Sequence, residues 1–316
     1  MSKRILVKFT VSNEGILKEC DIGHARRLRS LTVPESVVCI GKNSMCGLIC
    51  NELIMPSTLK AIEQYAFKDA EIDHIDFKKC KLESIENGAF RDCTTRTELP
   101  DTVEYIGSGC EFKLAKGKKI RLPKSLKYIS MSSIKLDGIR EVEVQEGMVR
   151  IDSNLARWLD HRLAFKKWII LRVFRDGEEL YRFIYNERWR VDKSECNYIG
   201  PQGMLYDQYD LHFEDTYSLH CKVLMAAYRL VWPTDLPEEI EKKYRLYVRA
   251  NIWNLLQGEE RDIENIRLFN NAGLVTVFRL KELLEIATAT QNVELAAYLV
   301  EAIQKKSGSK SKSLKM

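Results

Sequence analysis

Apolar and polar positions follow one sequence pattern that recurs between residues 31 and 151. An apolar–x–apolar triplet is followed by proline, by Ser or Thr two positions later, by an aliphatic residue, and by an isoleucine three positions further on. Clear copies lie at Leu31–Ile40, Leu53–Ile62, Thr97–Ile106 and Ile120–Ile129, and degenerate copies at Ile75–Ile85 and Val142–Ile151. The period is 22 residues with one step of 23. Such a period is typical of a solenoid of about six leucine-rich coils, which bury their apolar faces only by stacking on one another.

Each copy predicts the same local structure. The triplet forms a short strand with its first and third side chains in the core, and proline ends the strand because it has no amide donor. The Ser or Thr is expected to bond a nearby backbone amide and turn the chain. The aliphatic residue and the isoleucine then fill the coil from the return side. Ile62 and Ile129 are therefore expected to be buried, and Pro56 and Pro123 to end strands.

The repeat resembles the BspA-type leucine-rich repeat, which is known from bacterial surface antigens. Ile40-Gly41 and Ile106-Gly107 match the Ile-Gly of that family, and Ala66-Phe67 and Ala89-Phe90 match its Ala-Phe tail. The third and sixth copies depart from the family pattern because they lack the proline. The resemblance implies a right-handed stack of coils that is used for binding and carries no catalytic residues.

The repeat period stops after Ile151. Residues 153–166 are predicted to form a short connecting helix that caps the solenoid. Two β-rich runs follow, and Asp176-Gly177 between them is a strong hairpin signal because Gly tolerates a positive φ. A lone hairpin is marginal in water, so it must pack on the last repeat or on the helices that follow.

From Tyr206 onward the apolar spacing is helical. Pro237 suits the first turn of a helix whose apolar face runs from Ile240 to Leu255 and which Gly258 ends. A last helix pair, 280–290 and 293–304, is predicted to meet at Gln291-Asn292. This pair is similar to the helices of one ankyrin repeat, although the Thr-Pro-Leu-His opening is missing.

These patterns predict an α+β protein: a short right-handed leucine-rich-repeat solenoid, then a β-hairpin, then an α-helical domain. The expected divisions are an N-terminal cap (1–30), the repeats (31–152), the connecting helix and hairpin (153–203), the helical domain (204–305) and a disordered Lys/Ser-rich tail (306–316).

Composition adds little to this picture. The chain has 316 residues, 45% hydrophobic and 30% charged, with a net charge of +5, which is ordinary for a globular protein. The basic N-terminal segment Met1–Arg4 is followed by only three apolar residues before the charged Lys8. An export signal needs a longer apolar core. Without such a signal or a run of about 20 apolar residues, we expect a cytoplasmic protein with no membrane contact, unless a leader has been trimmed from the sequence.

Candidate chemistry is scarce. Most of the nine cysteines, including Cys46, Cys93 and Cys110, are expected to be reduced thiols that pack the coils. His212, His220 and Cys221 lie close in sequence but are better explained as helix surface and packing residues than as a metal site or nucleophile. No Walker loop, dinucleotide fingerprint or Gly-x-Ser-x-Gly elbow occurs. We therefore expect no catalytic residues, no cofactor and no metal.

Strand residues that face away from the core are expected to form columns on the sheet surface. One column is Thr32, Ile54, Asp76, Glu98, Arg121 and Glu143, and the next is Ser30, Glu52, His74, Arg96, Lys119 and Glu141. Mixed charges without aromatic residues are typical of a solvated surface. A better candidate for partner binding is a basic cluster in the fifth repeat, next to Tyr105 and Tyr128 at equivalent positions of adjacent coils. This cluster consists of Lys116, Lys118, Lys119, Arg121, Lys124 and Lys127.

The sequence therefore predicts a non-enzymatic protein-interaction or scaffold protein with an unidentified protein partner. The helical domain would supply a second contact or an oligomer interface. One alternative is a nucleic-acid or anionic-polymer binder that uses the basic fifth repeat and the Lys-rich tail, with weak affinity because acidic columns lie nearby. A second alternative is an enzyme whose site is assembled within residues 167–305.

Overall fold

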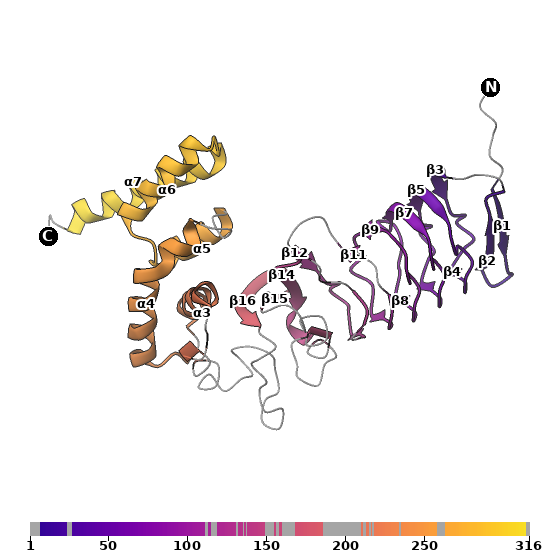
Figure 1. The fold of residues 1–316 in the computed structure, drawn as a ribbon, viewed down its shortest axis with the longest axis horizontal. Coiled ribbons are helices and arrows are strands. Elements are labelled where there is room, and N and C mark those ends of the chain that lie inside the picture. The colour runs from indigo at the N-terminus through magenta and orange to yellow at the C-terminus, as the bar shows by residue number, and fades with distance from the viewer. Residues whose placement is uncertain are drawn as a thin grey trace. The chain divides into compact units, whose positions relative to one another are not determined.

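The computed structural model describes residues 7–23, 27–110, 113–114, 119–130, 132–134, 136, 138–148, 155, 158–159, 168–185, 210, 213–214, 216, 218–233, 235–257 and 263–313. The chain divides into two compact units, Met1–Met204 and Leu205–Met316. The first unit contains the repeats and the hairpin, and the second contains the helices (Figure 1).

One side of the solenoid is a sheet of short parallel strands, one from each coil (Figure 1). The strands are β4 (Cys39–Ile40), β6 (Ala61–Ile62), β8 (Ser84–Ile85), β10 (Tyr105–Ile106) and β13 (Tyr128–Ile129). Each ends in the isoleucine of the repeat, and all five isoleucines are fully buried. The predicted burial of Ile62 and Ile129 is thus confirmed. An antiparallel hairpin, β1 (Lys8–Val11) and β2 (Ile16–Asp21), adds to the sheet through β4.

The strands of the opposite side fall into three separate sheets. β3 (Leu28–Thr32), β5 (Ile49–Ile54) and β7 (Glu71–Asp76) form the first. β9 (Arg96–Thr97) pairs with β11 (Lys113–Leu114) in the second. β12 (Lys119–Arg121) and β14 (Glu141–Gln145) begin the third. Strands β5 and β12 end two residues before Pro56 and Pro123, as predicted.

The hydroxyl residues after the prolines connect neighbouring coils. Thr58 Oγ1 donates to the Glu35 and Val37 carbonyls, at 2.8 and 2.7 Å, and Thr102 Oγ1 donates to the Leu82 carbonyl at 2.7 Å. The expectation that these hydroxyls accept from a nearby amide was wrong for both threonines. A hydroxyl can donate as well as accept, and stacking brings carbonyls of the preceding turn beside it.

The predicted hairpin is present and continues the last sheet of the solenoid. β15 (Ile169–Arg175) and β16 (Glu178–Tyr185) are antiparallel, and the turn residues Asp176 and Gly177 have φ of 51° and 89°. β15 pairs in parallel with β14, so the hairpin packs on the last repeat. Of the predicted connecting helix, only Leu155, Trp158 and Leu159 are described; all three are fully buried.

The second unit contains five described helices: α3 (Leu219–Val231), α4 (Glu238–Leu256), α5 (Ile263–Asn271), α6 (Val277–Ala289) and α7 (Val293–Ser313). Pro237 immediately precedes α4, whose predicted apolar face buries Tyr244, Val248, Ile252 and Leu255. Gly258 lies outside the described residues.

The final helix pair is also present, and Gln291 makes the turn between α6 and α7 with a φ of 54°. α7 continues to Ser313, so residues 306–313 are helical rather than the disordered tail that we expected. The lysines favour a helix and the serines oppose it only weakly, so an existing helix can extend through such a segment.

The cysteine predictions are mostly confirmed for the residues that the structure describes. Cys50, Cys80, Cys93, Cys110 and Cys221 are buried free thiols. Burial raises the pKa of the Cys93 and Cys110 thiols to about 12. Cys46 is exposed, contrary to expectation, because it lies in a turn next to Gly47. His212 lies outside the described residues.

Candidate partner-binding surface

The predicted surface columns are aligned in the first three repeats. Ser30, Glu52 and His74 pair in register, as do Thr32, Ile54 and Asp76 one column further along the strands. His74 is exposed and Asp76 is half-buried. Arg27 reaches across this surface to Glu71 and Asp73, at 3.2 and 3.4 Å. The columns here are therefore a polar face, and the ion pairs of Arg27 lie beside them.

The columns are interrupted after the third repeat and again after the fourth, contrary to the expectation of two continuous rows, because β3, β5 and β7 form one sheet, β9 and β11 a second, and β12 and β14 belong to a third. Arg96 begins β9, which pairs with the additional strand β11, whereas Lys119 and Arg121 lie on β12 in another sheet. Glu98 is exposed just after β9, and the side chain of Arg96 lies outside the described part of the chain. β11 pairs with β9 at the position where the strand of the next coil would otherwise pair.

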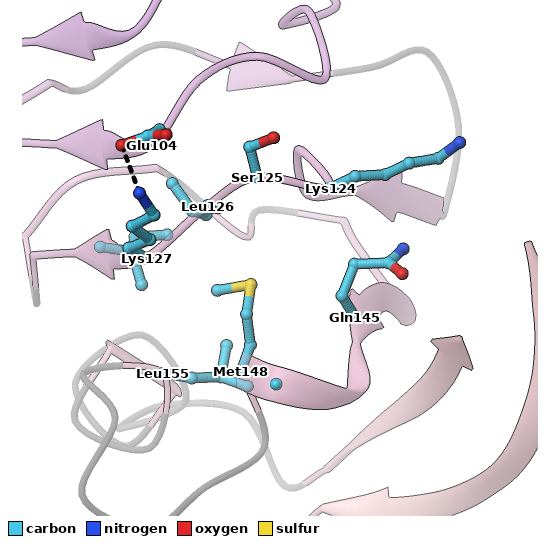
Figure 2. Close-up of a pocket in the computed structure, with 10 residues that line it drawn as sticks. Glu104, Lys124, Ser125, Leu126, Lys127, Gln145, Met148 and Leu155 are labelled. Atoms are coloured by element: carbon cyan, nitrogen blue, oxygen red, sulfur yellow. Dashed lines mark hydrogen bonds and ion pairs between the residues drawn. The ribbon is translucent and has the colours of Figure 1, made fainter. Parts of the chain in front are cut away.

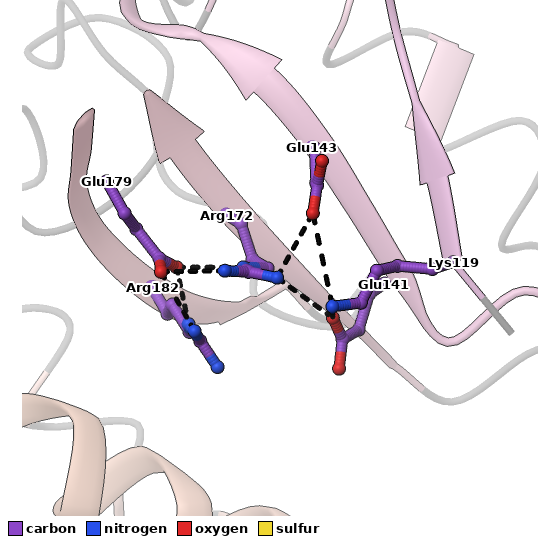
Figure 3. Close-up of polar contacts among 6 residues, drawn as sticks. All are labelled: Lys119, Glu141, Glu143, Arg172, Glu179 and Arg182. Carbon is purple, nitrogen blue, oxygen red and sulfur yellow. Dashed lines mark hydrogen bonds and ion pairs between the residues drawn. The ribbon is translucent and has the colours of Figure 1, made fainter. Parts of the chain in front are cut away.

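The ends of both columns join an ion-pair network with the hairpin (Figure 3). Arg172 of β15 bonds Glu179 through Nε and Nη2, each at 2.8 Å, and Glu143 through Nη1 at 3.0 Å. Arg182 bonds the same Glu179, and Lys119 lies 3.1 Å from Glu141. The network thus contains three cationic and three anionic side chains.

Burial makes this network structural rather than available to a partner. The Arg172 and Arg182 side chains are only 8% and 3% exposed. Burial by itself would raise the pKa of Glu179, but hydrogen bonds from Arg172 and Arg182 hold that pKa below its usual value. Glu143, predicted as a surface residue, therefore helps to hold the hairpin against the last repeat through Arg172, whereas Lys119 is 42% exposed and contacts Glu141 and Glu143 of β14.

Tyr105 and Tyr128 form a stacked pair on the other side of the solenoid. Their ring centroids are 4.9 Å apart, with an angle of 10° between the planes. The parallel register of β10 and β13 places them opposite each other. Tyr128 is 36% exposed, and burial raises the pKa of the Tyr105 hydroxyl above its usual value. The residues just before them, Glu104 and Lys127, form an ion pair at 2.7 Å.

The basic cluster of the fifth repeat is largely neutralised. Its described cations have carboxylate partners: Lys119 with Glu141 (3.1 Å), Arg121 with Asp101 (3.0 Å), Lys124 with Asp101 (3.5 Å) and Lys127 with Glu104 (2.7 Å). Lys116 and Lys118 lie outside the described residues. Asp101 is shared by two cations, so one positive charge remains in excess there.

A pocket of about 470 Å³ lies beside this cluster, between the turns of the fifth and sixth coils (Figure 2). Leu126, Ile129, Met148 and Leu155 supply apolar lining; Lys124, Ser125, Gln145 and the Glu104–Lys127 pair supply polar groups. Figure 2 shows Met148 and Leu126 facing each other, with Lys124 and Gln145 to one side. This pocket was not predicted from the sequence; Gln145, which stands at the proline position of the sixth repeat, is one of its lining residues.

The candidate residues for metal binding or nucleophilic chemistry are His220 and Cys221 among the described residues. No three His, Cys, Asp or Glu side chains there are placed to hold a metal ion. His220 is half-buried and the Cys221 side chain is buried in α3. Among the described residues, no helix is long and apolar enough to cross a membrane.

The comparison with known protein families agrees with the repeat architecture. The sequence matches the BspA type leucine rich repeat region in six copies, over residues 23–135 and 94–156. The repeats of this chain are thus similar to those of this family. A solved structure, the pneumococcal vaccine antigen PcpA, is similar over 49% of this chain and 66% of its own, just under two thirds, with 14% identity and a TM-score of 0.18. No curated protein matches the chain.

Proposed function

We propose that this protein is a non-enzymatic interaction module that binds a protein partner at the fifth BspA-type repeat. The contact would centre on the stacked Tyr105–Tyr128 pair and extend over the adjoining Glu104–Lys127 pair. The helical unit would supply a second contact or an oligomer interface.

The observation that carries this proposal is the stacked aromatic pair, in which Tyr128 is exposed and Tyr105 is half-buried. Interfaces favour tyrosine at their centres because its ring buries a large area and its hydroxyl still finds a polar partner. Stacking orders both rings before a partner arrives, which lowers the entropy lost on binding. The neighbouring salt bridge supplies the polar rim that surrounds such a centre.

The experiment is affinity capture from native lysate with the full chain and with Tyr128→Ala. We expect Tyr128→Ala to lose at least one discrete protein that the wild type retains. The matched control is Leu246→Ala, which removes a 70% exposed side chain from α4 in the other unit. A capture profile that Tyr128→Ala leaves unchanged would count against the proposal.

The alternative, an anionic-polymer binder, is supported by the excess positive charge around Asp101. It is weakened by the carboxylate partners of the described cations. Phosphate contacts release counterions, so replacing Lys118, Lys119 and Lys124 by Ala would reduce the salt slope by about three if all three bind phosphate. We expect a dissociation constant of about 10⁻⁵ M or weaker at physiological salt. Sub-micromolar binding that the triple variant abolishes would favour the alternative.

A further inference from the structure

The aromatic stack of the fourth and fifth coils ends at Tyr105. The parallel register of β8, β10 and β13 places Tyr105 between Tyr128 and Ser84. One ring face of Tyr105 stacks on Tyr128, with centroids 4.9 Å apart. On the other side, the neighbouring strands offer only the short side chains of Ser84 and, one coil further, Ala61. Among the described residues, no further ring or cation contacts the Tyr105 ring. A planar group of a partner can therefore continue the stack above Ser84.

A carboxylate without an ion pair lies beside this end of the stack. Glu86, two residues after Ser84, is half-buried and forms no ion pair with any residue in the described part of the chain. Burial, and after it the negative charge of Glu86, raise the pKa of the Tyr105 hydroxyl, so the carboxylate is near that ring. Gly107 occupies the equivalent position of the next coil, as the backbone hydrogen bonds between coils show. Because Gly107 has no side chain, that position leaves the Glu86 carboxylate uncovered.

Glu83 adds a second negative charge on the other flank of Ser84. Its side chain is exposed and, within the described ranges, forms no ion pair. Lys60 stands at the equivalent position of the preceding coil and can offset only one of the two carboxylates, Glu83 or Glu86. The surface next to Tyr105 thus carries an excess of negative charge, and a complementary partner is cationic there.

Arginine is the side chain that meets both requirements. Its guanidinium is planar, so it stacks on an aromatic ring face, and its fork of N–H donors pairs with a carboxylate. The lysine ammonium is a compact charge without a plane to stack, and an uncharged ring would leave Glu86 without a counter-charge. We propose that the protein partner presents an arginine whose guanidinium stacks on Tyr105 above Ser84 and pairs with Glu86. This inference rests on the proposed function, because it names the chemistry of the partner at the same tyrosine pair.

The test is a titration of the full chain, labelled with ¹³C in its tyrosine rings, with the peptide acetyl-Gly-Gly-Arg-Gly-Gly-amide. Tyr105→Phe assigns the Tyr105 signal. We expect a saturable shift of that signal, at a dissociation constant on the order of 10 mM for so small a ligand. Peptides with lysine or with citrulline, which is planar but uncharged, should bind at least about threefold more weakly. No saturable shift with the arginine peptide, or equal affinity for the citrulline peptide, would overturn the proposal.

Two variants separate charge recognition from stacking. Glu86→Gln should weaken the arginine peptide about threefold and leave the citrulline peptide unaltered. Ser84→Tyr extends the stack with a residue that the equivalent positions of the next two coils already carry, and it should abolish the response to both peptides. Glu98→Gln is the matched control: Glu98 is exposed in the same coil as Tyr105 but just after β9, on the opposite side, and its loss should change neither affinity. Unchanged arginine affinity in Glu86→Gln or in Ser84→Tyr would contradict the assignment.

The titration and the capture experiment fail separately. The titration uses a defined peptide, so it can show no arginine recognition while Tyr128→Ala still loses a captured protein. That combination would overturn the arginine assignment and leave the protein interaction standing. Arginine recognition together with a capture profile that Tyr128→Ala leaves unchanged would instead count against the proposed function alone.

Discussion

The ring of Tyr65 lies so close to Gly88 of the next coil that a Cβ atom at residue 88 would come within 2.4 Å of its Cε1 atom. Both residues have left-handed backbone conformations, with φ of 58° and 66°. Such a conformation is unusual for a bulky residue and ordinary for glycine. Gly88 therefore meets two requirements at once, the positive φ and the close approach of the ring.

Replacing Gly88 by Ala should lower the free energy of unfolding by about 2–4 kcal/mol, because strain in φ adds to overlap with the ring. Gly47→Ala is the matched control: it has a φ of 67° and no atom within 4 Å of the new Cβ. Gly47→Ala should lower the free energy of unfolding by only about 1 kcal/mol. Denaturant titration measures both, and equal losses would show that the Tyr65 contact is not tight.

Arg172 should be far more important for stability than Arg175, although both make two hydrogen bonds to one carboxylate. Arg172 is 8% exposed, whereas Arg175 is 59% exposed. Arg172→Ala removes two hydrogen bonds to Glu179 and one to Glu143 in a part-buried network and leaves only Arg182 and Lys119 to pair with its carboxylates, so it should cost about 2–3 kcal/mol. Arg175→Ala should cost about 0–1 kcal/mol. Thermal or denaturant unfolding would contradict this view if the two losses were similar.

Glu179 should make the stability of the repeat unit sensitive to acid. Hydrogen bonds from Arg172 and Arg182 hold its folded-state pKa below the usual value, in spite of burial. Its stabilising contribution is thus present above the unfolded-state pKa, about 4.3, and is lost as the pH falls through the folded-state pKa. Glu179→Gln should flatten the stability profile below about pH 5. An unchanged slope there would assign the acid sensitivity to other carboxylates.

Thiol reactivity should distinguish Cys46 from the buried cysteines. Cys46 is exposed, whereas burial raises the pKa of Cys93 and Cys110 to about 12, which leaves almost no thiolate at neutral pH. A thiol reagent should label Cys46 before the other cysteines that the structure describes in the native protein, and all nine cysteines of the sequence after unfolding. Cys46→Ser should remove the fast phase. Two or more intact disulfides would contradict the reduced state.

The regular part of the fold could be predicted because its signal repeats in register. Ile62 and Ile129 recur at one phase of the period, and that phase places them in the core. The hairpin turn at Asp176-Gly177 is a local signal of the same quality. The direction of the Thr58 hydrogen bonds was not predictable from one coil, because the acceptors belong to the coil before it.

The residues of the candidate surface could be predicted from the sequence only in part. The equivalent phases of Tyr105 and Tyr128 allowed their proximity to be predicted. The pairing of Glu143 with Arg172 depends on the register of β15 against β14, which hydrophobic patterns do not specify. The pocket is lined by residues of several coils, and so it needs the packed structure.

The central claim, that the exposed face of the fifth repeat binds a protein, is tested most directly by site-specific photo-crosslinking in native lysate. A photoreactive amino acid replaces Tyr128 in one protein and Leu246, the exposed residue of α4, in the control. Position 128 should yield a discrete crosslinked band that position 246 lacks and that excess unlabelled wild-type protein removes. A smear identical at both positions, with no band that the wild type competes away, would contradict the claim.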